Sequence, residues 1–210
     1  MTDSDRVILI DDDDEVRRAA TWLLEAAGYT VDAYASAESF LAAPRVPGPS
    51  CLVLDIQMPG VSGIALQDIL NRQGDDTPVV FISGHADVPT AVRALKNGAV
   101  DLLQKPFENQ ALLARVRAGL DRHRRLQGES RWRDAWEKRY ETLSIREREV
   151  LDEMVLGHPN KVIADHMNIS VKTVEIHRQR VMRKMNVESL AALVGEYVRA
   201  RGLPTPAPGT

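Results

Sequence analysis

The chain has 210 residues, of which 44% are hydrophobic and 27% are charged, and its formal net charge is -3. Such a composition is typical of globular proteins, and the length allows one or two domains that each bury a core. The single cysteine, Cys51, excludes an intramolecular disulfide, and no apolar run approaches the roughly 18 residues that would span a bilayer. Because the N-terminus also lacks the basic start and apolar stretch of a signal peptide, we expect a cytoplasmic protein with no membrane partner.

The charge is unevenly distributed along the chain. Residues 1–120 carry 10 Lys and Arg against 17 Asp and Glu, whereas residues 121–210 carry 17 Lys and Arg against 13 Asp and Glu. An acidic half joined to a basic half indicates two different partners, a cation for the first half and a polyanion for the second.

From residue 6 to about residue 120, short apolar runs alternate with amphipathic stretches, which is the pattern of βαβ units and a parallel sheet. The apolar runs predict strands near 6–10, 30–34, 51–54, 78–83 and 100–104. The stretches between them predict helices near 15–27, 37–43, 63–73, 87–96 and from 108 onward. Gly28 and Gly98 stand where the first and fourth helices should end, as C-terminal caps.

Polar side chains follow four of these strands. Asp11 and Asp12 follow the first strand, and Asp55 ends the third. Ser83 ends the fourth strand, and Lys105 follows the fifth. Because open parallel sheets bind ligands outside the carboxyl ends of their strands, these five side chains should converge on one small polar site.

Three neighbouring carboxylates repel one another unless a cation offsets their charge. Mg²⁺ prefers oxygen ligands, so we expect it to bind Asp11, Asp12, Asp55 and the backbone carbonyl of Gln57. With the cation present, a phosphoryl group could approach Asp55 as the nucleophile, while an ammonium and a hydroxyl from the other strand ends stabilise its charge. The alternative for the acidic run 11–14, taken alone, is a solvated loop that caps a helix.

Residues 121–142 are predicted to form a helical linker. Their charges show no core pattern, but Trp132, Trp136 and Tyr140 recur at helical spacing. This aromatic stripe either docks on a neighbouring domain or forms a self-association seam. Gly128 could interrupt the helix, because glycine costs about 1 kcal/mol relative to alanine.

Residues 143–203 predict a small domain of four short helices. Ser144 and Glu147 have the spacing of a capping box and should begin the first helix, which ends near residue 156. Asn160 and Ser170 are the expected N-caps of the second and third helices, and Ser189 begins the fourth. The expected ranges of these three helices are 160–167, 170–185 and 189–198. The tail 204–210 is rich in Pro and Gly, and we expect it to be disordered.

The third of these helices carries a basic face. Within residues 171–185 there are five Lys and Arg against one acid, Glu175. Ile176 is unusual on such a polar face and could contact a thymine methyl group in a major groove. Taken alone, a basic helix face is more often a solvated surface than a binding surface.

The first half resembles the receiver domain of two-component response regulators. The segments DD, LDIQMPGVSG, FISGH and GAVDLLQKPF carry this likeness over about residues 5–120. The resemblance implies a doubly wound, flavodoxin-like α/β fold whose five parallel strands are ordered 2-1-3-4-5. It also implies that Asp55 is the phosphoacceptor, that Ser83 and Lys105 contact the phosphoryl group, and that the bond before Pro106 is cis. Leu102 stands where many receivers place an aromatic switch residue, so Ser83 and an aliphatic side chain would form the switch.

The second half resembles the helix-turn-helix domain of LuxR-type regulators, through LSIREREVL, NKVIADHMNIS and VKTVEIHRQRVMRKM. Its pairing with a receiver resembles the FixJ and NarL group. Recognition helices present side chains to the major groove, and the expected base contacts come from Glu175, Ile176 and Gln179. The expected phosphate contacts come from Lys172, Thr173, Arg178 and Arg183. His177 could face either the DNA backbone or a dimer partner.

Together these features predict a transcription regulator and not an enzyme. The predicted organisation is a receiver domain (1–120), a helical linker (121–142) and a DNA-binding domain (143–203). A sensor histidine kinase would phosphorylate Asp55, and the phosphorylated homodimer would bind promoter DNA and act on RNA polymerase.

Two alternatives remain. The first is a magnesium-dependent aspartyl phosphatase, although residues 11–15 satisfy only the first half of its DxDx[TV] motif. The second is a regulator whose acidic pocket is vestigial and which works without phosphorylation. There is no GxxxxGK[ST] loop, so no ATPase module is expected, and five scattered histidines with one cysteine predict no zinc site.

Overall fold

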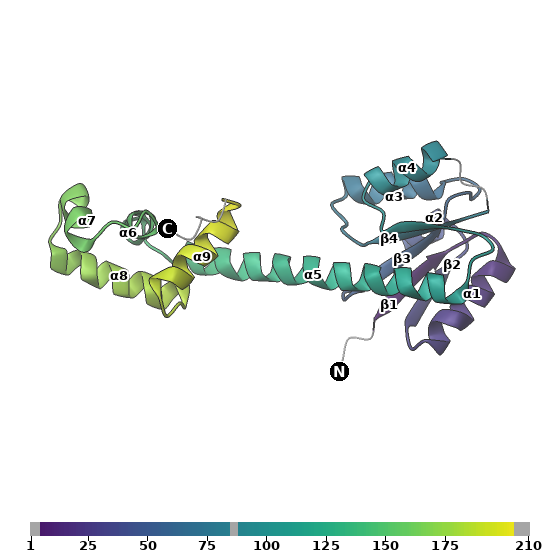
Figure 1. Ribbon diagram of the computed structural model, residues 1–210, viewed down its shortest axis with the longest axis horizontal. Coiled ribbons are helices and arrows are strands. Elements are labelled where there is room, and N and C mark those ends of the chain that lie inside the picture. The colour runs from purple at the N-terminus through teal and green to yellow at the C-terminus, as the bar shows by residue number, and fades with distance from the viewer. Residues whose placement is uncertain (1–4, 85–87, 204–210) are drawn as a thin grey trace. The chain divides into compact units, whose positions relative to one another are not determined.

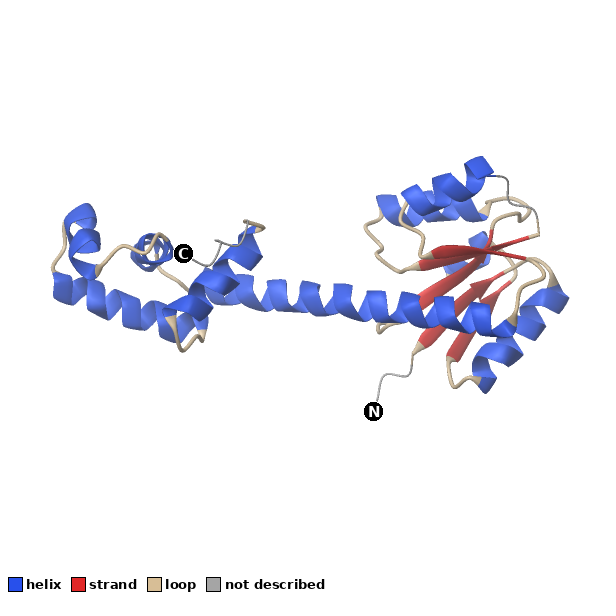
Figure 2. Cartoon of the chain, in the orientation of Figure 1, coloured by secondary structure: helices blue, strands red, loops and turns tan. Residues whose placement is uncertain are grey.

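The computed structural model describes residues 5–84 and 88–203. The chain divides into two compact units, with the division between Gly128 and Glu129 (Figure 1, Figure 2). The predicted helix start at residue 87 and the predicted disorder of the tail lie outside the described residues. Within those residues, no helix combines the length and the apolar character needed to cross a membrane. The predicted boundaries of a separate linker, 121–142, stay a prediction.

The first unit is built on a parallel sheet with the strand order β2-β1-β3-β4-β5, as predicted. Its strands are β1 (Arg6–Ile10), β2 (Thr30–Tyr34), β3 (Ser50–Asp55), β4 (Val79–Ser83) and β5 (Asp101–Gln104). Every residue of β3 and β4 is buried, which explains why these two runs are almost wholly apolar. The carboxyl ends of all five strands meet at one edge of the sheet.

Helices cover both faces of this sheet. They are α1 (Asp14–Ala26), α2 (Ala37–Ala42), α3 (Gly63–Arg72), α4 (Val88–Lys96) and the start of α5 (Asn109–Glu141). Alternate strand residues point to opposite faces, so two separate cores form. One core joins Leu52, Leu54 and Phe81 to the helices α2, α3 and α4. The other joins Val53 and Val80 to α1 and α5.

Glycines end two of these helices as expected. Gly28 and Gly98 follow α1 and α4 with φ angles of 91° and 92°, in the left-handed region that favours glycine. The possible interruption at Gly128 does not occur, since α5 passes through it. A single glycine costs only about 1 kcal/mol, which the surrounding helix-forming residues offset.

The second unit contains the end of α5 and four further helices. These are α6 (Ile145–Val155), α7 (Asn160–Met167), α8 (Val171–Met185) and α9 (Leu190–Arg201). Trp136 is 1% exposed in the core of this unit, and Trp132 and Tyr140 pack against that core. The aromatic stripe therefore docks within the second unit. The guanidinium groups of Arg199 and Arg201 lie over its rings and strengthen the attachment.

The N-caps of the second unit follow the sequence in three of four helices. Ser144 and Glu147 form the predicted capping box, and Ser170 and Ser189 cap α8 and α9. The prediction for Asn160 was wrong, because it is already the first helical residue of α7 and Pro159 occupies the cap position. Proline tolerates the start of a helix because its N–H is missing, and this moves the start one residue earlier.

Gly63 holds the loop after β3 against the strand end. Its N–H donates to the carbonyl oxygen of Ile56 at 3.0 Å. A Cβ at this position would lie 2.2 Å from the carbonyl oxygen of Asp55, closer than any real contact. The loop can therefore approach Asp55 only where the chain has no side chain.

Gly63→Ala should consequently destabilise the first unit by roughly 1 to 3 kcal/mol, the usual cost of overpacking. Denaturant unfolding of both proteins measures this difference. Gly128→Ala is the matched control, because nothing lies within 4 Å of an added Cβ there. It should stabilise its helix by about 1 kcal/mol. Equal effects of the two substitutions would show that the close approach at Gly63 is not real.

Candidate functional site

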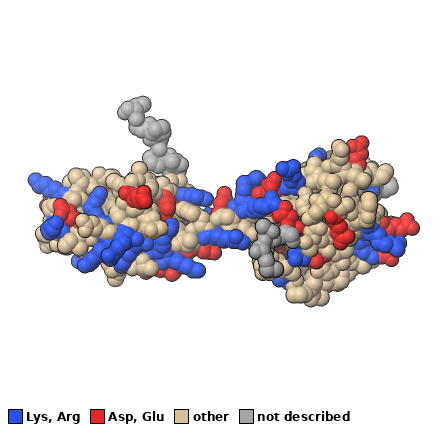
Figure 3. Space-filling model, turned by 90° about the horizontal axis from the view of Figure 1, so that it is seen from below, with Lys and Arg blue, Asp and Glu red and all other residues tan. Residues whose placement is uncertain are grey.

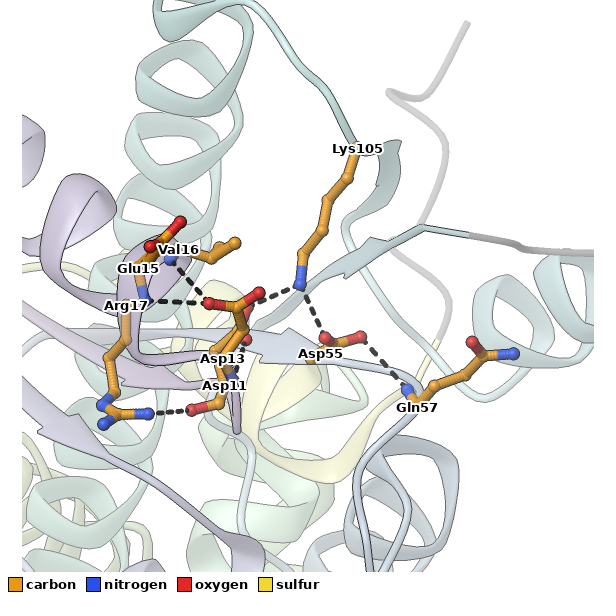
Figure 4. Close-up of polar contacts among 8 residues, drawn as sticks. All are labelled: Asp11, Asp13, Glu15, Val16, Arg17, Asp55, Gln57 and Lys105. Atoms are coloured by element: carbon orange, nitrogen blue, oxygen red, sulfur yellow. Dashed lines mark hydrogen bonds and ion pairs between the residues drawn. The ribbon is translucent and has the colours of Figure 1, made fainter.

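A polar site lies at the carboxyl ends of the strands (Figure 4). The ammonium of Lys105 donates to Asp11 Oδ2 at 2.7 Å and to Asp55 Oδ2 at 2.6 Å. The side chains of Asp11, Asp55 and Lys105 are 0%, 8% and 18% exposed. One cation therefore bridges two nearly buried carboxylates that come from different strands.

Backbone groups fix both carboxylates from a second side. Asp55 Oδ1 accepts from the N–H of Gln57 at 3.1 Å, and Asp11 Oδ1 accepts from the N–H of Asp13 at 3.0 Å (Figure 4). The guanidinium of Arg17 also donates to the carbonyl oxygen of Asp11 at 2.7 Å. Arg17 was not predicted as a site residue, because nothing in its spacing from Asp11 distinguishes it from a solvated helix residue.

The residues of the acidic run 11–14 have two different roles. Asp13 caps α1 by accepting from the N–H groups of Glu15 and Val16, whereas Asp11 belongs to the polar site. These amide hydrogen bonds lower the pKa of Asp13. The capping interpretation of the run is thus confirmed for Asp13, whereas the binding of a cation by Asp11 and Asp12 stays a prediction.

Burial and charge act in opposite directions on the groups of this site. Burial raises the pKa of Asp11 above its ordinary value, and the hydrogen bond from Lys105 offsets this only in part. Burial alone would lower the pKa of Lys105, but its hydrogen bonds to Asp11 and Asp55 outweigh that effect and raise it. Lys105 therefore keeps its ammonium charge between the two carboxylates at neutral pH.

Asp11, Asp12 and Asp55 form a possible cation site. Each offers a carboxylate oxygen, and these oxygens lie within 4.8 Å of one another. Asp12 is exposed, so the group opens to solvent on one side. Three oxygens with space for water match the preference of Mg²⁺. The backbone of Gln57 reaches the same site through its N–H, and ligation through its carbonyl stays a prediction.

Ser83 lies at the same edge with an unused hydroxyl. It is 0% exposed, and its Oγ has no hydrogen-bond partner among the described residues. Its carbonyl oxygen accepts from the N–H of Lys105 at 2.7 Å, which places the two residues side by side. A buried hydroxyl without a partner costs about 1 to 3 kcal/mol, so the Ser83 hydroxyl is a donor that a group bound at this site could satisfy.

Leu102 occupies the position of the expected switch. It pairs with Phe81 in the register of β4 and β5 and packs, half buried, against the core that contains Phe81. Its role in transmitting a change at Ser83 stays a prediction.

A second candidate site is the outer face of α8. Val174, Val181 and Met185 bury the inner face, whereas Ile176 is 40% exposed. The other predicted contact residues are exposed or half buried: Lys172, Thr173, Glu175, Arg178, Gln179 and Arg183. Lys and Arg predominate over Asp and Glu on the face of the second unit drawn in Figure 3.

Lys184 does not contribute to this basic face as a free charge. Its ammonium donates to Glu147 Oε2 at 2.6 Å and to the carbonyl oxygen of Thr142 at 2.8 Å. Burial alone would raise the pKa of Glu147, but the hydrogen bonds from Lys184 and Ser144 outweigh it and lower it. Lys184 therefore ties α8 to the start of α6.

The comparisons with known proteins match both units. A model of the response regulator receiver domain matches residues 7–117, and a model of bacterial regulatory proteins of the luxR family matches residues 141–196. The chain is 44% identical over 194 residues to the transcriptional regulatory protein FixJ of Azorhizobium caulinodans, covering 92% of each chain. The chain belongs to the FixJ-like response regulators. It is also 40% identical to the response regulator protein TodT of Pseudomonas putida, covering 92% of this chain and 86% of that one.

Similarity to solved structures supports the same family. The response regulator StyR matches with a TM-score of 0.84 and 41% identity, covering 92% of this chain and 98% of that chain. FixJ-N, with a TM-score of 0.53 and 38% identity, covers 58% of this chain and 96% of its own. The protein is thus a two-component response regulator with a receiver and a LuxR-type DNA-binding domain. A receiver implies a histidine kinase as partner, and the second domain implies DNA.

Mg²⁺ should raise the melting temperature of this response regulator, because a ligand that binds only the folded state stabilises it. Asp12→Asn should weaken Mg²⁺ binding at least tenfold, since even second-shell losses cost about 10 to 100-fold. Glu15→Gln is the matched control, because Glu15 adjoins the same acidic run and its exposed side chain has no ion pair among the described residues. Thermal unfolding over a series of Mg²⁺ concentrations measures both effects. Equal losses of Mg²⁺ affinity in the two variants would mean that Mg²⁺ binds to the acidic run as a whole and not to this site.

Proposed function

We propose that phosphorylation of Asp55 by a histidine kinase switches this response regulator. The observation that carries the proposal is the bridge from Lys105 to Asp11 and Asp55, beside the unpartnered hydroxyl of Ser83. The carboxylate of Asp55 is thus a nucleophile that has the ammonium of Lys105 and the hydroxyl donor of Ser83 beside it. Phosphoryl transfer depends mainly on such positioning and charge stabilisation.

The chemistry of the transfer follows from these contacts. A carboxylate oxygen of Asp55 attacks the phosphorus of the donor phosphohistidine, and the bond from phosphorus to the imidazole nitrogen breaks. Bound Mg²⁺, held by Asp11, Asp12, Asp55 and the carbonyl of Gln57, would neutralise charge on the phosphoryl oxygens. Without that neutralisation, the carboxylates would repel the incoming group.

The switch follows from the new charge on Asp55. A phosphoryl group adds up to about two negative charges, so Lys105 can exchange its bond to Asp55 for one to a phosphoryl oxygen. The Ser83 hydroxyl can then donate to another phosphoryl oxygen and gain the partner that it lacks. Leu102 would follow Ser83 inward and alter the surface near β5. This shifts an equilibrium between two receiver states that already exist.

The two alternatives receive less support. In a DxDx[TV] phosphatase the second aspartate would be Asp13, but its carboxylate caps α1 and is committed to two N–H groups. A vestigial pocket would not need Asp11, Asp55 and Lys105 to stay in hydrogen-bond contact. Phosphorylation therefore accounts for more of the geometry than either alternative.

The output that we propose is sequence-specific binding to promoter DNA. Glu175, Ile176 and Gln179 would contact bases, and Lys172, Thr173, Arg178 and Arg183 would contact phosphates. The phosphorylated form would bind as a homodimer and act on RNA polymerase in the cytoplasm, where both the kinase output and the promoters are found.

Acetyl phosphate with Mg²⁺ should add the mass of one phosphoryl group to the wild-type protein, as measured by intact mass spectrometry. Asp55→Asn should remove this gain completely, because the amide is not a nucleophile. Asp68→Asn is the control, since Asp68 lies on α3 and pairs with Arg93 away from the site. A mass gain that survives Asp55→Asn would place the phosphate on another residue.

DNA fragments retained by the phosphorylated protein should reveal the operator, against which variants are then compared. Gln179→Ala should relax the preference at one base pair, worth about 1 to 3 kcal/mol. Arg183→Ala should weaken binding to all sequences alike and reduce the salt slope by about 1. Arg146→Ala is the control, since Arg146 lies on α6 and pairs with Glu149. The assignment of α8 would be wrong if Arg146→Ala weakened binding as much as Arg183→Ala.

A further inference from the structure

A second cluster of metal-ligand side chains lies in the DNA-binding domain, around the turn between α6 and α7. Glu153 Oε2 is 2.6 Å from His158 Nδ1 and 3.0 Å from His166 Nδ1. The two imidazole rings are almost perpendicular, with centroids 5.3 Å apart. The three possible ligand atoms all lie within 4.8 Å of one another.

The end of α6 explains why His158 returns to Glu153. Gly157 has a φ of 81°, and its N–H donates to the carbonyl oxygen of Met154 at 3.1 Å. The N–H of His158 donates to the carbonyl oxygen of Glu153 at 3.2 Å. These two bonds form a Schellman motif, in which the residue after the glycine packs back on the last turn of the helix. The contact is usually hydrophobic, but here it pairs an imidazole with a carboxylate.

His166 reaches the same point from α7. Ile163 and Ala164 anchor that helix in the core of the second unit, so its position relative to α6 is fixed by packing. The three side chains therefore come from one helix, the turn after it and the next helix. The sequence spacing predicted no zinc site, because residues 153, 158 and 166 converge only through this turn.

We propose that Glu153, His158 and His166 bind a Zn²⁺ ion. Two imidazole nitrogens and one carboxylate oxygen are ligands that Zn²⁺ accepts, with a fourth position left for water. Mg²⁺ does not suit this set, because it prefers oxygen ligands alone. The cluster is thus chemically distinct from the acidic site of the receiver.

The present distances need little change to admit the ion. Ligands about 2.0 to 2.1 Å from a tetrahedral Zn²⁺ stand roughly 3.3 Å from one another. The side chains would therefore move apart by roughly 0.7 Å for Glu153 and His158 and by roughly 0.3 Å for Glu153 and His166. Their exposures of 22% for Glu153, 36% for His158 and 50% for His166 leave room for that movement.

The proton balance of binding is simple. For Glu153 Oε2 to accept both hydrogen bonds, each imidazole has to carry a proton on Nδ1. On binding, each ring carries its proton on Nε2, and the freed Nδ1 lone pair coordinates the metal. The ion replaces two hydrogen bonds with three metal–ligand bonds and joins α6 to α7.

Isothermal titration of the full-length protein with Zn²⁺, in excess Mg²⁺ to fill the receiver site, tests the proposal. The wild type should bind one Zn²⁺ per chain. His158→Ala, His166→Ala and Glu153→Gln should each bind it at least 100-fold more weakly, because loss of a direct ligand exceeds the roughly 10 to 100-fold cost of outer-shell losses. Glu149→Gln is the matched control: it removes the same charge from the same helix, outside the cluster, and should bind Zn²⁺ like the wild type.

Substitution with Co²⁺ provides an independent readout. A histidine-ligated tetrahedral Co²⁺ ion absorbs visible light strongly, and this absorption should appear in the wild type and disappear in His166→Ala. Because His166 is half exposed, that variant should remain folded, with an unfolding midpoint near that of the wild type in the absence of Zn²⁺. Zn²⁺ binding that His166→Ala leaves unchanged, or no binding by the wild type, would show that the cluster is only a set of hydrogen bonds.

Discussion

The ammonium of Lys105 between Asp11 and Asp55 is the interaction on which the receiver site depends. The strand order makes it possible: β1 and β3 are neighbours, so their terminal carboxylates lie close together. β5 lies beyond β4, so the long side chain of Lys105 has to cross the end of β4, where Ser83 is located. Burying two carboxylates costs several kcal/mol each unless they are paired, so the site is stable only while a cation remains between them.

The surrounding fold holds the carboxylate of Asp55 closely and leaves two neighbouring side chains with fewer contacts. β3 and β4 are buried throughout, and Gly63 lets the next loop press against Asp55. These side chains are Ser83, whose hydroxyl has no hydrogen-bond partner among the described residues, and Leu102, which is only half buried. In the second unit, the ion pair of Lys184 with Glu147 joins α8 to the start of α6, and the outer face of α8 is the surface that we propose for DNA.

The sequence predicted most of the fold, because the signals that decide it are local. Apolar runs located all five strands, and the strand-end rule predicted that Asp11, Asp55 and Lys105 lie close together. Local rules failed at Asn160, because the neighbouring proline occupies the N-cap position. They also did not decide whether the aromatic stripe docks on a domain or forms a self-association seam. They could not reveal the cluster around Glu153 at all, since this glutamate and the two histidines come together only after the turn at Gly157 has reversed the chain.

The central claim is that the carboxylates of Asp11 and Asp55 and the ammonium of Lys105 form one coupled unit that a divalent cation enters. NMR of the side-chain carboxyl carbons and of the Lys105 Nζ during a Mg²⁺ titration tests it most directly. The account predicts that all three signals shift together, in one saturable step with a common midpoint. Signals that shift with different midpoints, or a Lys105 signal that does not respond, would contradict it.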